Sequence, residues 1–165
     1  MVEDWFMLKL YHGSDVEIQQ IDLSMGHINK DFGKGFYLTD IKKQAEDMAK
    51  RRARTTLNGK PTITTFLFDE QHLTSGEFEV KVFDRVSEEW ADFILKNRRA
   101  SLTGFQHSFD IVVGPVADDG VVLQLNLYEQ QYITLSELVE RLKYRDINNQ
   151  YYFGTEKAIQ TLQRI

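Results

Sequence analysis

The chain has 165 residues, of which 42% are hydrophobic and 27% charged, a composition typical of globular proteins and outside the range of disordered ones. Its formal net charge of −5 disfavours general binding to nucleic acids or anionic membranes, and the absence of cysteine excludes disulfides, thiolate metal sites and a cysteine nucleophile. No apolar run approaches about 18 residues and the N-terminal residues are acidic, so we expect a cytoplasmic protein with a single domain over residues 1–165 and no membrane partner.

The N-terminal third predicts two short strands and a helix. Residues 6–11 form the first expected strand, with a His-Gly-Ser sequence at its C-terminal end, and the aromatic residues 36–39 form the second. Thr39 or Asp40 can cap the helix that follows. Its inner face is expected to hold Ile41, Ala45, Met48, Ala49 and Ala53.

The middle of the chain adds strands at residues 62–68, 77–83 and 109–116. The last of these is continuously apolar, which favours a position in the interior of the sheet. Between the second and third of them, Ser87 is expected to cap an amphipathic helix that closes near Arg98 and Arg99.

The C-terminal part predicts helices over residues 121–131 and 135–144, the second opened by a capping box of Thr134 and Glu137. A short strand at residues 149–153 follows, and Thr155 can cap a final helix. The inner face of that helix is expected to hold Ala158, Ile159, Leu162 and Ile165. About six strands that do not alternate regularly with helices indicate the α+β class.

The common nucleotide-binding loops are excluded by their glycine spacing. The third glycine of a dinucleotide fingerprint beginning at Gly33 falls on Leu38, and the first glycine of a phosphate-binding loop ending at Gly33-Lys34 falls on Ile28. The four histidines have no metal-ligand spacing, so we expect no metal.

Two N-terminal motifs instead resemble those of a known superfamily. Residues 10–14 read Leu-Tyr-His-Gly-Ser, and residues 31–39 read Asp-Phe-Gly-Lys-Gly-Phe-Tyr-Leu-Thr. They resemble the first two NAD-binding motifs of the ADP-ribosyltransferases of the diphtheria-toxin and poly-ADP-ribose-polymerase type. The resemblance implies an α+β fold with a split, bent β-sheet and flanking helices, and NAD bound as co-substrate in its cleft.

The resemblance also implies roles for individual residues. His12 would hydrogen-bond the adenosine ribose, the backbone of Gly13 would hold the nicotinamide amide, and Tyr37 would stack on the nicotinamide ring. Six further residues would line the cofactor site, with Ser14 near a ribose and Lys34 near the pyrophosphate: Tyr11, Ser14, Gly33, Lys34, Gly35 and Phe36.

The third motif of these enzymes carries a glutamate that stabilises an oxocarbenium-like transition state. Residues 131–133 and 149–153 match its pattern loosely, and because the capping box leaves no room for a strand after Gln131, we choose Gln150, with Glu129 and Gln131 as alternatives. The expected triad is therefore His12, Tyr37 and Gln150. An amide can bind a ribose hydroxyl, but it supplies no negative charge.

Three function classes follow from these residues: a mono-ADP-ribosyltransferase, an NAD glycohydrolase, or a catalytically inactive module that binds NAD or a protein. The acceptor can be a protein, a nucleic acid or a small molecule. Residues 110–118 and 149–155 extend the resemblance to a small bacterial family grouped with the ADP-ribosyltransferases. That second resemblance implies a toxin of a toxin–antitoxin pair, with a cognate antitoxin as partner.

Overall fold

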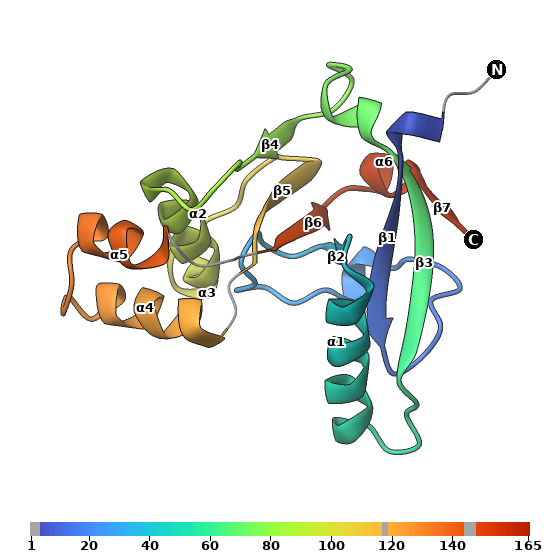
Figure 1. The fold of residues 1–165 in the computed structure, drawn as a ribbon, viewed down its shortest axis with the longest axis horizontal. Coiled ribbons are helices and arrows are strands. Elements are labelled where there is room, and N and C mark those ends of the chain that lie inside the picture. Colours follow the sequence, from blue (N-terminus) through green and yellow to red (C-terminus); the bar gives the residue numbers. More distant parts are fainter. Residues whose placement is uncertain (1–3, 117–118, 144–147) are drawn as a thin grey trace.

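The computed structural model describes residues 4–116, 119–143 and 148–165. These residues form a seven-stranded sheet in the order β4-β5-β6-β2-β1-β3-β7, in which β4 and β5 are parallel and every other neighbouring pair is antiparallel (Figure 1). The strands are β1 (Met7–Ser14), β2 (Phe36–Thr39), β3 (Thr62–Asp69), β4 (Val80–Val82), β5 (Ile111–Pro115), β6 (Asn149–Phe153) and β7 (Leu162–Arg164).

Six α-helices and three short 3₁₀ helices flank this sheet in the described residues, so the fold is α+β, as predicted. The α-helices are α1 (Lys42–Thr55), α2 (Glu88–Arg98), α3 (Ala100–Thr103), α4 (Asp119–Glu129), α5 (Leu135–Leu142) and α6 (Glu156–Ile159). The 3₁₀ helices cover Asp4–Phe6, Leu23–Met25 and Glu70–Leu73.

The sheet is strongly curled, and its two parts run in different directions in Figure 1. Strands β1 and β3 are paired along their whole length, from Met7 opposite Asp69 to Ser14 opposite Thr62. Strands β1 and β2 are paired only where Tyr11 lies opposite Thr39. The sheet is therefore nearly split between β1 and β2.

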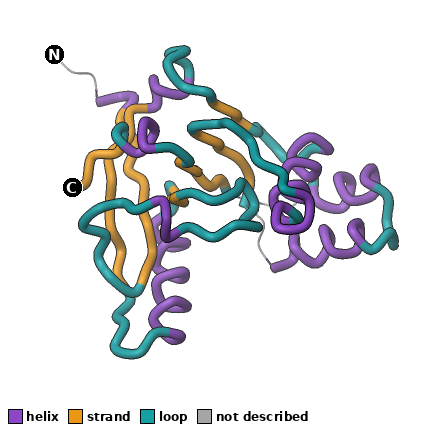
Figure 2. The backbone as a smooth tube through the Cα atoms, turned by 180° about the vertical axis from the view of Figure 1, so that it is seen from behind, coloured by secondary structure: helices purple, strands orange, loops and turns teal. Residues whose placement is uncertain are grey.

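Two hydrophobic cores cover the opposite faces of the sheet, because side chains alternate along a strand. One core packs α2, α4 and α5 against Val112 and Tyr152. The other contains Leu10, Phe66 and Phe153, and the loop after β1 contributes to it. Figure 2 shows that loop lying across the strands. The long segment between β1 and β2 is thus held against the sheet.

Local signals in the sequence predicted several helix boundaries correctly. The hydroxyl of Ser87 accepts a hydrogen bond from the Trp90 N–H at 3.1 Å at the start of α2. The hydroxyl of Thr134 accepts one from the Glu137 N–H at 3.1 Å at the start of α5. Helix α4 matches the predicted helix over residues 121–131 closely. Helix α5 ends at Leu142 with Lys143 as its C-cap, one residue short of the described part of the predicted helix, and residue 144 lies outside the described residues.

Other boundaries differ from the prediction. The residue before α1 is Ile41, which makes no side-chain cap, while the Thr39 hydroxyl accepts from the Ile41 N–H at 3.1 Å. Strand β1 continues to Ser14, so the His-Gly pair lies within the strand, and β4 is shorter than predicted. The final helix ends at Ile159, and Leu162–Arg164 pairs with β3 as β7.

Candidate functional site

His12 lies where β1 and β2 separate. Continuing the antiparallel register from Tyr11 and Thr39 would place Gly13 opposite Tyr37. The ladder stops before that pair, and the Tyr37 carbonyl oxygen instead pairs with Nδ1 of His12 at 2.8 Å. An imidazole therefore takes the place of a backbone donor, and the two strands open into a fork, which we define by Tyr11, His12 and Gly13 of β1 and Tyr37 and Thr39 of β2.

The hydrogen bond fixes the chemical state of His12. A carbonyl oxygen only accepts, so Nδ1 carries the proton, and Nε2 of the neutral ring is left as an acceptor. Burial lowers the pKa of His12, and the charge of Arg52 lowers it further. The ring stacks on Phe36 at 4.4 Å between centroids. No residue in the described part of the chain hydrogen-bonds Nε2, so this nitrogen can accept a hydrogen bond from a ligand hydroxyl.

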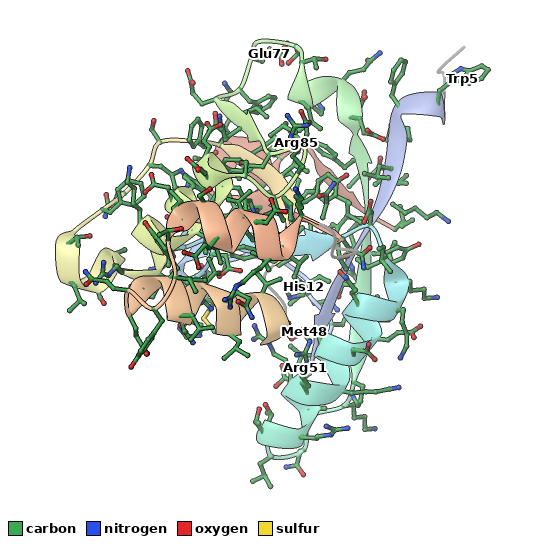
Figure 3. All side chains as sticks on the ribbon, turned by 60° about the vertical axis from the view of Figure 1, so that its left-hand side comes forward. Trp5, His12, Met48, Arg51, Glu77 and Arg85 are labelled. Atoms are coloured by element: carbon green, nitrogen blue, oxygen red, sulfur yellow. The ribbon has the colours of Figure 1, made fainter. Side chains whose placement is uncertain are left out.

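Gly13 is required here by helix packing. A Cβ at this position would lie 2.0 Å from the Ala45 carbonyl oxygen and 2.9 Å from the Ala49 nitrogen, both in α1. Figure 3 labels His12 together with Met48 and Arg51 of that helix. The motif resemblance explains Gly13 by the close approach of nicotinamide to the backbone. The structure gives a second reason for a glycine at this position, since α1 packs directly on the β1 backbone.

The phenol of Tyr37 is held by the segment before β2. Its hydroxyl donates to the Gly33 carbonyl at 2.5 Å and accepts from the Phe32 N–H at 3.0 Å. Burial raises the pKa of Tyr37 well above its ordinary value. Its ring packs edge-on against Tyr152 at 5.3 Å between centroids. The hydroxyl thus anchors residues 32–33 above the sheet.

Gln150 lies on β6, the strand on the other side of β2, where it faces Thr39 in β2 and Gly114 in β5. His12, Tyr37 and Gln150 therefore come from three adjacent strands. The amide nitrogen of Gln150 is buried and is the one such side-chain atom without a hydrogen-bond partner among the described residues. Unsatisfied buried polar groups are costly, so this amide is a candidate ligand contact.

Beside Gln150 lies an ion pair that the sequence did not predict. Oδ1 of Asp31 is 3.0 Å from Nε of Arg98, and the two side chains are only 17% and 28% exposed. Burial raises the pKa of Asp31, while Arg98 and the Gln150 amide oppose that rise. The Gln150 amide is close enough to act on the carboxyl, but its geometry falls short of a hydrogen bond. Asp31 is the first residue of the second motif, so the motif pointed to this carboxyl, whereas no local sequence pattern links it to Arg98.

The remaining predicted residues have structural contacts. Ser14 is 5% exposed and donates to Asp15 at 3.0 Å, and a Cβ on Gly35 would lie 2.3 Å from the Tyr152 ring. Lys34 lines a cavity of about 440 Å³ together with Gly33 and His107. The alternative Glu129 is the last residue of α4 and pairs with Arg99 at 3.4 Å, and Gln131 follows that helix. Helix α4 lies to the left of α1 in Figure 1. Glu129 and Gln131 are not part of the fork.

Within the described residues, no group of three or more His, Asp or Glu side chains is arranged to bind a metal. None of the helices in this part of the chain combines the length and apolar character needed to cross a bilayer.

The fold and the fork define an α+β domain whose split sheet brings residues from β1, β2 and β6 to one place. The chain belongs to the family described as "Protein of unknown function (DUF3990)", which matches residues 8–164. No curated protein and no solved structure matches the chain.

Proposed function

We propose that this protein binds NAD at the fork between β1 and β2 and transfers its ADP-ribose to an acceptor, as a mono-ADP-ribosyltransferase. The observation that carries the proposal is the Gln150 amide, which is partly buried and has hydrogen-bonding capacity that the described residues leave unused. Nε2 of His12 adds an acceptor on β1. Ribose hydroxyls both donate and accept, so the two riboses of NAD can each satisfy one of these groups.

The reaction needs little covalent chemistry from the protein. The bond between C1′ of the nicotinamide ribose and the nicotinamide nitrogen breaks, and nicotinamide leaves with the electron pair. A nucleophilic atom of the acceptor bonds to C1′ and loses its proton to water. The sugar carries positive charge in between, so groups that orient the ribose and stabilise that charge lower the barrier.

The test is incubation of the purified protein with NAD labelled on its adenylate half, with and without a cell lysate. Label in macromolecules supports transfer, and free nicotinamide without transferred label supports the glycohydrolase. Stabilisation by NAD without turnover indicates an inactive binding module; linkage predicts about 2.7 kcal/mol at 100 times the dissociation constant. No turnover and no thermal shift with millimolar NAD would contradict NAD binding at this site.

The role of toxin is part of the same proposal and rests on the resemblance of the motifs. Expression in a bacterial host is expected to slow growth, and Gln150→Ala is expected to relieve that effect. Growth arrest that persists in Gln150→Ala would mean that the harm does not depend on Gln150.

A further inference from the structure

Four side chains on one face of β2 and β6 lie beneath Asp31. Tyr37 faces Tyr152 and Thr39 faces Gln150 in the register of the two strands, and alternate residues of a strand share a face. The Phe32 N–H donates to the Tyr37 hydroxyl, which fixes the backbone next to Asp31 over this group. Arg98 from α2 then pairs with Oδ1 of Asp31 at 3.0 Å. The Asp31 carboxyl is thereby held beside the Gln150 amide.

A glutamine at position 150 suits the neighbouring Asp31 carboxyl. The buried amide nitrogen of Gln150 is a donor without a partner, and the Gln150 side chain is close enough to act on the Asp31 carboxyl. A glutamate at position 150 would instead place two carboxyl groups together, and one of them would tend to stay protonated. A glutamine is therefore compatible with Asp31 at this place, and a glutamate is not.

We propose, on the basis of the proposed NAD chemistry, that Asp31 holds the negative charge of this site and acts through Gln150. When the ribose binds, Nε2 of Gln150 donates to the Asp31 carboxylate, which leaves Oε1 to accept a hydrogen bond from a ribose hydroxyl. Asp31 is thus a positioning residue that orients and polarises the amide. In the superfamily that the motifs resemble, one glutamate provides both the contact and the charge, whereas this chain divides them between two residues.

Arg98 adjusts the charge on Asp31. The titratable groups that act on Asp31 within the described residues are Arg98 from α2, Lys30 from its own segment and the Tyr37 phenol from β2. Arg98 and Lys30 favour the carboxylate, and burial opposes it. Because burial has the larger effect, we expect nicotinamide release to fall on acidification at a pH above the ordinary aspartate range.

The test is a double-mutant cycle that measures nicotinamide release from NAD by wild type, Asp31→Asn, Gln150→Glu and the double variant. Asp31→Asn is expected to lower kcat about tenfold or more with little change in KM. Gln150→Glu is expected to lower it as well, because two carboxyls then adjoin. The double variant moves the charge to position 150 and is expected to recover to within about threefold of wild type. Asp92→Asn, which removes an exposed partner of Lys96 on α2, is the control and should change nothing.

Arg98→Gln tests whether activity depends on the charge state of the Asp31 carboxyl or only on the ion pair as a structural contact. It keeps Asp31 but removes a charge that lowers the Asp31 pKa, so the acid limb of the pH profile is expected to move to higher pH. A purely structural ion pair would lower activity equally at every pH. Thermal unfolding of each variant verifies that the fold is intact.

The inference is overturned if wild type releases nicotinamide and Asp31→Asn does so equally fast, or if the double variant is no better than Asp31→Asn. Either result leaves the proposed function standing. Wild type that neither binds nor cleaves NAD contradicts the proposed function and the positioning role of Asp31 together. The pairing itself is then tested without NAD, since Gln150→Glu must lower the melting temperature more in wild type than in Asp31→Asn.

Discussion

His12 is held by a single hydrogen bond, from its protonated Nδ1 to the carbonyl oxygen of Tyr37. The bond serves the fold, because it satisfies a carbonyl left unpaired where β1 and β2 separate. It also leaves Nε2 as an acceptor, which is the atom that the proposed NAD site uses. The two roles use different atoms of the ring, so substitutions can separate them.

His12→Asn is the substitution that separates them. Asparagine offers an N–H close to the position of Nδ1 but has no atom that corresponds to Nε2. We expect the fold to persist while the dissociation constant for NAD rises about tenfold, the equivalent of one hydrogen bond. Titration calorimetry of His12→Asn against His27→Asn, which alters an exposed histidine, measures the difference. Equal affinities of the two variants for NAD would show that His12 does not contact NAD.

The pH dependence of stability provides a second test at single residues. His107 accepts from the Phe109 N–H through Nδ1 and pairs with the Phe32 carbonyl through Nε2 at 2.6 Å, an arrangement that requires the neutral ring. Burial lowers its pKa, so the unfolded chain binds more protons than the folded protein as the pH falls below about 6.5. The free energy of unfolding therefore falls on acidification.

Denaturant unfolding at about pH 7.5 and about pH 5 measures this loss. His107→Gln is expected to lose less stability over that interval than wild type. The raised pKa of Asp31 acts in the opposite direction, so the comparison between variants is the informative quantity, not the total change. If the free energy of unfolding of His107→Gln fell as much over this pH interval as that of wild type, the result would contradict the assigned tautomer.

At the scale of elements, α1 and β1 are packed backbone to backbone at Gly13. Gly13→Ala would bring a Cβ to 2.0 Å from the Ala45 carbonyl oxygen, and the helix has to move as a unit. We expect a loss of stability at or above the upper end of the usual range of about 1–3 kcal/mol for overpacking.

Gly104→Ala is the matched comparison. Gly104 has a φ of 73° and nothing near its Cβ position, so only backbone strain of about 1–2 kcal/mol applies. Denaturant unfolding compares the two variants. If Gly13→Ala were the milder of the two, the close packing of α1 on β1 would be disproved.

Local signals predicted the helix starts at Ser87 and Thr134, because a capping hydroxyl and its N–H partner are three residues apart. The last strand was not predicted. The spacing of Ala158, Ile159 and Leu162 fits a helix, but pairing of β7 with β3 decides the conformation. Apolar spacing alone does not reveal which distant strand is available as a partner.

The same limit applies to the site. His12, Tyr37 and Gln150 were selected by motif, and the order of β1, β2 and β6 brings their strands together. The ion pair between Asp31 and Arg98 joins a loop to a distant helix, and no local pattern encodes it. Ligand contact by Gly13 and Gly35 stays a prediction from the motifs, and the structure adds that both glycines are required by packing, against α1 and against Tyr152.

At the scale of the whole molecule, the curled sheet and its covering helices hold three strands so that a loop, a helix end and the fork meet around Gln150. Gln150 lies on β6 in the interior of the sheet, with β5 and β4 on one side and β2, β1, β3 and β7 on the other. The central claim is that NAD is cleaved at this place.

The most direct measurement is the rate of nicotinamide release from NAD by wild type, Gln150→Ala and Gln163→Ala, each verified to be folded. Gln163 is an exposed glutamine on β7 and is the matched control. We expect wild type and Gln163→Ala to release nicotinamide at equal rates, and Gln150→Ala to be about 10 to 100 times slower, the effect of one buried hydrogen bond in the transition state. Release by Gln150→Ala at the wild-type rate, or no release by wild type, would contradict the claim.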